Sequence, residues 1–290
     1  MKKHALKNGP FPLLRFAIAA TAAALCLSLP PRAAAEPLPL WEAGAGVTVL
    51  QFPDYRGSDE SRTWVLPFPY LVYRGEFLQA DERRIRGLFF RTERLELDTS
   101  LGGTVPVKSS ENDARRGMPD LDATLEIGPS LNVLLARSDD RKTRVELRLP
   151  ARVVLASDFS YLRQVGWNFQ PNVNADVRDP LGASGWNLGM LAGPVFSDRR
   201  YNRYFYGVDP AFSTAARPAY SPGGGYAGAQ AIAALSKRYR EFWVGGFAKW
   251  DVLDGATFED SPLVRVRQNF TAGVAVAWIL GKSRRQVEVP

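Results

Sequence analysis

The chain has 290 residues, of which 46% are hydrophobic and 23% are charged, with 37 basic residues, 30 acidic residues, one cysteine and one histidine. His4, Cys26 and five of the basic residues all lie within the first 35 positions. The remainder is nearly neutral and has no thiol or imidazole, which argues against nucleic-acid binding, disulfides and histidine-based catalysis.

The N-terminal segment predicts a secretory signal peptide. Basic residues precede an apolar run from Phe16 to Leu29, and Ala33–Ala35 follow it. A membrane-spanning helix needs about 20 apolar residues, so this run is too short for one. A lipoprotein site at Cys26 is disfavoured because Leu25 stands where a small residue is needed. We therefore expect residues 1–35 to be a signal peptide that is cleaved near Ala35 after Sec-type export.

Downstream, apolar and polar residues alternate in runs, which is typical of β-strands with two different faces. In TRVELRLPARVVLAS, for example, Val145 and Leu147 lie on one face while Arg144, Glu146 and Arg148 lie on the other. The runs predict about twelve strands, with ten or fourteen as alternatives because the third and fourth runs are weak. The predicted strands cover residues 41–50, 63–73, 76–80, 84–90, 94–105, 119–135, 143–157, 168–179, 185–198, 226–237, 241–252 and 264–280.

Length and spacing favour an all-β, transmembrane, antiparallel up-and-down β-barrel over residues 36–280. Several runs have 12 or more residues, whereas strands of soluble proteins usually have about 5 or 6 and a bilayer needs about 9 to 11. Short connections such as SDDRK alternate with long ones such as DFSYLRQVG, as in outer-membrane barrels. The last run also resembles the signal by which barrel-insertion machinery recognises a terminal strand. The residues of that candidate insertion signal are Thr271, Gly273, Val276 and Trp278.

The same reasoning predicts which charges face the lumen. A basic residue facing lipid near mid-bilayer costs about 2–4 kcal/mol, so the polar faces should point inward. The candidate lumen charges are Asp122, Glu126, Arg144, Glu146, Arg148 and Arg152. A barrel of about twelve strands lies between small filled barrels and wide channels, so ion-paired bracing and pore lining are both open.

We predict no enzymatic activity, metal site or cofactor. Carboxylate pairs such as Glu259 with Asp260 remain as alternatives for glycan hydrolysis, and Asp254 with the same pair for metal binding, but their spacing matches no known calcium loop. The tryptophans fall in or beside predicted strands, where interfacial girdles account for most of them.

One long connection, YFYGVDPAFSTAARPAYSPGGGY, has no period and is rich in aromatics, proline and glycine. It lies between the ninth and tenth predicted strands, on the extracellular side. We expect it to fold over or into the barrel mouth as a plug. The candidate plug residues are Tyr204, Phe205, Tyr206, Gly207, Val208, Tyr220, Gly223, Gly224 and Gly225.

Four segments together resemble the MipA/OmpV family of outer-membrane proteins, which are similar to an MltA-interacting protein. They are Pro53–Ser58, Leu66–Tyr70, the plug residues just given, and Asp260–Leu263 before the last strand. The resemblance covers essentially the whole mature chain and implies an outer-membrane barrel without catalytic or ligand residues. It departs from the family's pattern in residues 281–290, GKSRRQVEVP, which follow the last strand as a predicted periplasmic tail.

The resemblance implies a non-enzymatic scaffold that links a lytic murein transglycosylase to a bifunctional murein synthase at the outer membrane. The alternative is an outer-membrane channel or small-solute pore gated by the 199–225 loop. A third hypothesis is a soluble periplasmic binding barrel. Besides the murein enzymes, the expected partners are outer-membrane lipid and the barrel-insertion machinery.

Overall fold

The computed structural model describes residues 38–75, 78–80, 85–158 and 160–287, which belong to one compact unit. The predicted signal peptide and the last three residues of the predicted tail lie outside the described residues. The one described α-helix has eight residues, and no described helix is long and apolar enough to cross a membrane.

Strands dominate this unit, and only short helices interrupt them. The strands are β1 Leu38–Pro39, β2 Trp41–Pro53, β3 Ser61–Arg74, β4 Leu78–Ala80, β5 Ile85–Arg91, β6 Leu95–Thr104, β7 Ala123–Arg137, β8 Thr143–Ser157, β9 Leu162–Phe169, β10 Asn172–Arg178, β11 Trp186–Ser197, β12 Gly225–Arg238, β13 Phe242–Val252, β14 Gln268–Lys282 and β15 Gln286–Val287. The helices are η1 Ser109–Glu111, η2 Asp113–Arg115, η3 Pro180–Gly182, α2 Arg199–Tyr206 and η4 Pro210–Phe212.

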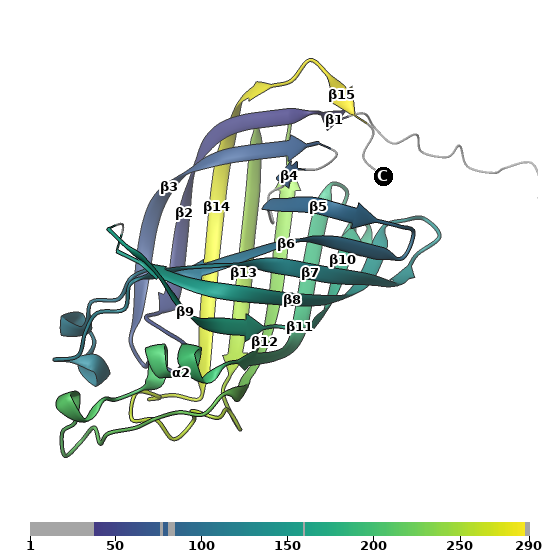
Figure 1. Cartoon of the computed structure of the whole chain (residues 1–290). Helices are drawn as coiled ribbons and strands as arrows, with labels where there is room; N and C mark the ends of the chain where they lie inside the picture. The colour runs from purple at the N-terminus through teal and green to yellow at the C-terminus, as the bar shows by residue number, and fades with distance from the viewer. Residues whose placement is uncertain (1–37, 76–77, 81–84, 159, 288–290) are drawn as a thin grey trace, which may run out of the picture. The chain divides into compact units, whose positions relative to one another are not determined.

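The main sheet is antiparallel and returns onto itself. Its thirteen described strands run in the order β10-β11-β12-β13-β14-β2-β3-β4-β5-β6-β7-β8-β9, and β8 also pairs with β10 while β9 pairs with β11 (Figure 1). Because β9 and β10 follow each other between β8 and β11, they share one position in the sheet. Twelve strand positions result, which agrees with the predicted up-and-down β-barrel.

The shared position corrects one predicted boundary. The segment DFSYLRQVG was expected to be a long connection, yet β9 begins within it, at Leu162. The strand is interrupted at Gln170 and Pro171 before β10 continues. Proline has no N–H to donate to a sheet, so it breaks the ladder at this point. The sequence prediction therefore found only the second half of this strand.

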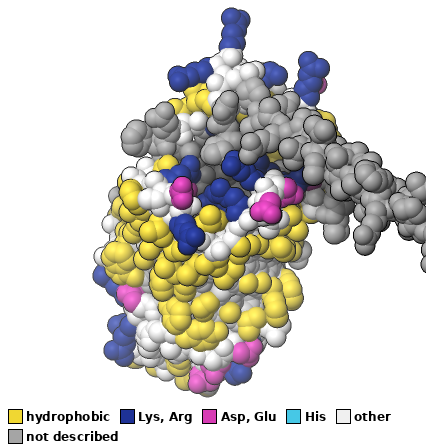
Figure 2. Space-filling view, turned by 90° about the vertical axis from the view of Figure 1, so that its right-hand side faces the viewer, with side chains coloured by type: hydrophobic (Ala, Val, Ile, Leu, Met, Phe, Trp, Pro, Cys, Tyr) yellow, Lys and Arg dark blue, Asp and Glu magenta, His cyan; other side chains and the backbone are white. Residues whose placement is uncertain are grey.

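The two faces of the sheet have opposite character. Residues of one face are exposed and apolar, for example Val47, Val65 and Val274, whose exposed fractions are 41%, 66% and 62%. The other face of the sheet carries buried polar groups, including Glu42 of β2 and Glu96 of β6. Figure 2 shows hydrophobic side chains in a broad band on one face, with charged side chains above and below it. This is the reverse of a soluble barrel, and it suits a wall surrounded by lipid.

The connections differ strongly between the two ends of the strands. Short turns at 92–94, 138–142, 179–185 and 239–241 mark what we call the turn end. Connection 54–60 and the much longer connections 105–122, 198–224 and 253–267 mark the loop end, where α2 lies (Figure 1). The termini of the unit meet at the turn end, because β1 pairs with β15.

The predicted tail is therefore ordered in part. β14 continues to Lys282, two residues beyond the expected boundary. The Leu40 N–H then donates to the Arg285 carbonyl at 2.8 Å, and the Ser283 N–H donates to the Trp41 carbonyl at 2.9 Å. We call this arrangement of β1 and β15 the terminal clasp.

The orientation of the faces can be tested with one pair of adjacent residues in the middle of β2. We expect Val47→Arg to lower the free energy of unfolding in lipid vesicles by about 2–4 kcal/mol, because the new charge faces lipid. Thr48→Arg should cost clearly less, because the half-buried Thr48 lies on the opposite face. Denaturant titration followed by heat-modifiable migration on gels measures both. Equal losses for the two variants would contradict the assigned orientation.

Candidate functional site

Charged side chains on the inner face form ion pairs both within β8 and between β8 and its neighbours. On β8, the Glu146 carboxylate pairs with Arg144 and lies 2.8 Å from Arg148 Nη2. Arg152 of the same strand lies 3.3 Å from Glu126 on β7 and donates to Ser100 Oγ. These five predicted lumen charges, three arginines and two glutamates, are therefore ion-paired within a polar wall, and Arg148 also lies 3.4 Å from Asp176 on β10.

The sixth predicted lumen charge lies elsewhere. Asp122 directly precedes β7 at the loop end, where its carboxylate lies 3.6 Å from Arg163 and accepts a hydrogen bond from the Tyr161 hydroxyl. Its backbone N–H donates to the Tyr204 hydroxyl at 2.8 Å. Burial, followed by the negative charge of Asp122, raises the pKa of the Tyr204 phenol to about 12. Asp122 thus contacts connection 198–224, which contains the predicted plug residues and which we call the plug segment.

Three asparagines beside the β8 arginines have buried polar atoms without a protein partner. They are Asn132, Asn168 and Asn172, with exposed fractions of 1%, 3% and 8%. In the sheet register, Asn132 and Asn172 are opposite Arg148 from either side. Buried amides of this kind are normally satisfied by water or a ligand, so this wall suits a hydrated lumen.

At the turn end, a second group of charges joins three strands. The Glu42 carboxylate of β2 lies 2.9 Å from Arg74 of β3 and 2.7 Å from Arg238 of β12. The Glu42 side chain is fully buried, so each of its oxygens needs such a partner. Tyr70, Val72 and Ala277 form a small apolar cluster of buried residues, separate from the large cluster at the loop end.

The loop end holds a hydrophobic cluster that we call the loop core. Its buried members come from four long connections and from strand residues beside them. They are Tyr55, Val107, Leu121, Val154, Ala156, Val165, Val195, Tyr201, Phe205, Tyr206, Val208, Ala227, Leu253, Ala256, Phe258 and Leu263. Because Val154 and Ala156 share the inner face of β8 with Arg152, the loop core reaches into the mouth of the barrel.

The predicted plug residues are central to this core. Tyr206 stacks on Phe258 with ring centroids 3.7 Å apart, and Val208 forms an antiparallel bridge with Tyr220. Gly207 ends α2, while Gly223 accepts a hydrogen bond from Asn202. Gly224 directly precedes β12, and Gly225 is the first residue of that strand.

The plug segment begins with a helix that the sequence analysis did not predict. Asp198 is its N-cap, since the carboxylate accepts from the Tyr201 N–H at 2.9 Å and from the Trp167 N–H of β9 at 3.1 Å. Tyr201, Asn202 and Phe205 are buried at a spacing of one helical turn. The Asp cap and this spacing were the available signals, but the aromatic and glycine-rich residues that follow suggested an aperiodic loop.

Arg115 is a further residue that sequence reasoning missed. Its side chain is buried, and it donates to the Phe205 carbonyl at 3.1 Å and to Ser109 Oγ at 3.3 Å. The guanidinium also lies 5.8 Å from the centre of the Tyr55 ring. Burial lowers the pKa of Arg115. The residue joins connection 105–122 to α2 and connection 54–60, so three loops depend on one side chain.

The candidate insertion-signal residues divide between the faces of β14. Val276 and Trp278 share the outer face, and Trp278 is 52% exposed. Thr271 and Gly273 alternate with them on the inner face.

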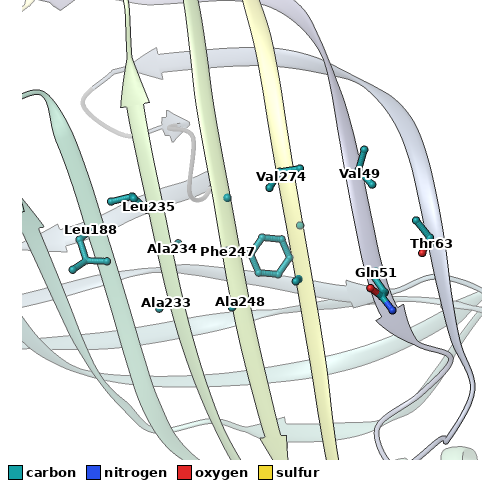
Figure 3. A pocket seen from close by; sticks show the side chains of 13 residues that line it. Val49, Gln51, Thr63, Leu188, Ala233, Ala234, Leu235, Phe247, Ala248 and Val274 are labelled. Atoms are coloured by element: carbon teal, nitrogen blue, oxygen red, sulfur yellow. The ribbon is translucent and has the colours of Figure 1, made fainter.

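A shallow apolar pocket of about 510 Å³ lies beside this strand (Figure 3). Val49 and Val274 line it with Leu188 and Leu235, and only Gln51 and Thr63 among its lining residues have polar side chains. The pocket therefore has no acid or base group for chemistry, and its lining suits acyl chains.

One glycine allows α2 to approach the sheet closely. Gly166 of β9 has a φ of +148°, and a Cβ there would lie 2.5 Å from the Tyr201 backbone nitrogen. We expect Gly166→Ala to destabilise the docked helix by about 1–3 kcal/mol and to expose connection 198–224 to protease. Gly223→Ala is the matched control, since a Cβ at Gly223 meets no atom within 4 Å. Equal cleavage of both variants would contradict the close docking of α2.

The geometry can be compared with solved structures. Outer membrane protein OprG from Pseudomonas aeruginosa is 9% identical, with 82% of this chain and 94% of that chain covered and a TM-score of 0.22. A chain described under asymmetric conductivity of engineered proteins and a mutant of Rh. blastica porin are each 10% identical, with 82% and 99% covered and TM-scores of 0.15. The barrel fold of this chain is defined by the strand pairing described above.

A family model matches most of the chain. A search of curated proteins found no match. The family model described as MltA-interacting protein MipA matches residues 45–280, which confirms the resemblance noted from the four sequence segments. The chain therefore belongs to the MltA-interacting protein MipA family and is an outer-membrane β-barrel protein.

Proposed function

We propose that the protein is a non-enzymatic scaffold that binds a lytic murein transglycosylase and a bifunctional murein synthase at the outer membrane. The observation that carries this proposal is the family match over residues 45–280, because the family is described by its interaction with MltA. The ion pairs of the inner wall support it, since pairs between neighbouring strands, such as Arg152 with Glu126 and Arg148 with Asp176, brace a barrel.

The turn end is the proposed docking surface for these periplasmic partners. If residues 1–35 are removed during export and the last strand carries the insertion signal, both ends of the mature chain lie in the periplasm. The terminal clasp then presents the exposed residues Arg284 and Arg285 beside the short turns. Two adjacent positive charges on an ordered segment suit an acidic patch on a partner.

The scaffold proposal is tested by pull-down of purified murein hydrolases and synthases with the barrel in detergent. We expect enrichment of a transglycosylase over an unrelated barrel, and a several-fold loss with Arg284→Glu combined with Arg285→Glu. The control combines Arg265→Glu with Arg267→Glu at the loop end, where both side chains are 56% exposed. Absence of enrichment with the unmodified barrel would refute the scaffold, and equal losses in both variants would refute docking at the turn end.

A pore gated by the 199–225 loop is the second candidate. The buried asparagine amides without protein partners favour it, because they indicate water inside the barrel. The plug segment then blocks the lumen in the resting state, held by Tyr206, Val208 and their partners in the loop core.

Planar-bilayer recording separates the two candidates. Deleting residues 209–221 removes the segment after the Val208 bridge, and a gated pore should then gain steady conductance while its insertion is unchanged. The Gly223→Ala variant serves as the control with an intact plug. A deletion variant that inserts but remains closed would contradict the pore and favour a braced interior.

A further inference from the structure

One edge of β3 has no strand partner along its loop-end half in the described part of the chain. β3 pairs with β2 along its whole length, but with β4 only at Tyr73 and Arg74. Because β4 ends at Ala80 and β5 begins at Ile85, this hairpin is too short to run beside β3 as far as Ser61. Figure 1 shows β4 and β5 on the side of the sheet away from α2.

β6 presents the opposite edge. Its residues Leu95–Thr104 all pair with β7, whereas only Glu96, Leu97 and Asp98 pair with β5. Within the described ranges, no strand lies between the loop-end halves of β3 and β6. The pairing thus leaves an interruption in the wall, which we call the lateral opening.

Two prolines in β3 indicate that one edge of this strand has no partner strand beside them among the described residues. The Arg74 N–H donates to the Leu40 carbonyl on the β2 side, so even-numbered residues of β3 direct their N–H groups toward β2. Odd-numbered residues direct theirs to the other edge, and Pro67 and Pro69 are odd-numbered. Proline has no N–H, and prolines in sheets are found on edge strands. Two unsatisfied donors, each costing several kcal/mol in lipid, are thereby avoided.

The outer side of the lateral opening is strongly apolar. On the β3 side Val65 is 66% exposed, and on the β6 side Leu101 is 42% exposed. These side chains belong to the face that surrounds the barrel with hydrophobic residues. The opening therefore faces the bilayer.

The inner side has two different walls. Along β2 and β3 it is apolar, with Phe52 stacked on Trp64 at 6.5 Å and Leu66 one position further along the inner face. Along β6, β7 and β8 it is polar, since Arg152 joins Ser100 and Glu126 there. Trp64 is 38% exposed although it shares the face of buried Tyr70, as expected for a side chain at the edge of an opening.

We propose that the lateral opening between β3 and β6 admits a single-chain amphiphile of the fatty-acid type from the membrane into the lumen. Its chain lies along Trp64 and Leu66, and its polar head reaches the wall that contains Arg152 and the asparagines with unsatisfied amides. The loop core fills the mouth of the barrel at the loop end, so the side of the wall offers the route from the bilayer. This inference is independent of the scaffold and of axial conduction.

Tryptophan fluorescence tests the opening, because bromine atoms on acyl chains quench only indoles that they touch. Variants retaining a single tryptophan, with the other six changed to phenylalanine, are placed in vesicles. Trp64 should be quenched by dibromo-phosphatidylcholine nearly as strongly as the outer Trp278, and much more than Trp243 of the inner face. Dibromostearate in unbrominated vesicles should also quench Trp64, saturably, if a free amphiphile enters. The proposal would be overturned if Trp64 were quenched by aqueous acrylamide but not by brominated lipid, or if neither acrylamide nor brominated lipid quenched it.

A second measurement leaves all tryptophans in place. In a Cys26→Ser background, Leu66→Cys should react with a membrane-soluble maleimide several-fold faster than Ile232→Cys, which lies on the inner face of a strand paired on both sides. Heat-modifiable migration verifies that each variant is folded. Equal maleimide reaction rates would show that the wall is closed at β3. If bilayer lipid quenches Trp64 but dibromostearate does not bind saturably, the opening stands and the fatty-acid guest is refuted.

Discussion

Backbone hydrogen bonding in lipid is the constraint on which the rest of this structure depends. A strand inside a bilayer loses several kcal/mol for each N–H or C=O group left unpaired, so the sheet returns onto itself and leaves few such groups. Here the pairing of β8 with β10 and of β9 with β11 accomplishes this, although Pro171 interrupts the strand that they share. The wall, interrupted at the lateral opening between β3 and β6, then places apolar side chains mainly outside and polar side chains mainly inside.

Buried polar side chains on the inner wall must in turn form hydrogen bonds or ion pairs with one another. Glu146 between two arginines and Glu42 between Arg74 and Arg238 meet this need with ion pairs across neighbouring positions. Such buried pairs contribute little net stability compared with apolar contacts, but removing one partner is costly because the other charge stays buried. The Glu42 pairs join three different strands and so help to fix how these strands are arranged, whereas the Glu146 pairs lie within β8.

Much of the wall was predictable from the sequence, because alternation with a period of two is a strong signal over 10 to 15 residues. The membrane-type barrel and its strand positions follow from runs such as the one around Arg148. The differences are local: the first five residues of β9 fall in a segment predicted to be a connection, and α2 is not predicted. Neither the break at Pro171 nor the Asp198 cap produces a periodic pattern. Arg115 was invisible for a different reason, since its partners Phe205 and Tyr55 are distant in the chain and meet only after the barrel has closed.

The loop core is stabilised by different interactions from those that stabilise the wall beneath it. It is an apolar cluster shielded from water by loops, as in a soluble protein, and its Tyr206–Phe258 stack is stabilised by the hydrophobic effect. Most exposed hydrophobic residues of the wall face lipid, and the buried apolar cluster described on its inner face, Tyr70 with Val72 and Ala277, is much smaller. The two parts therefore need not open together: loss of the Arg115 or Asp198 contacts loosens the mouth while the hydrogen-bonded sheet stays intact. By the same logic, an interruption at the Pro67–Pro69 edge relaxes the wall at one place without disturbing the mouth.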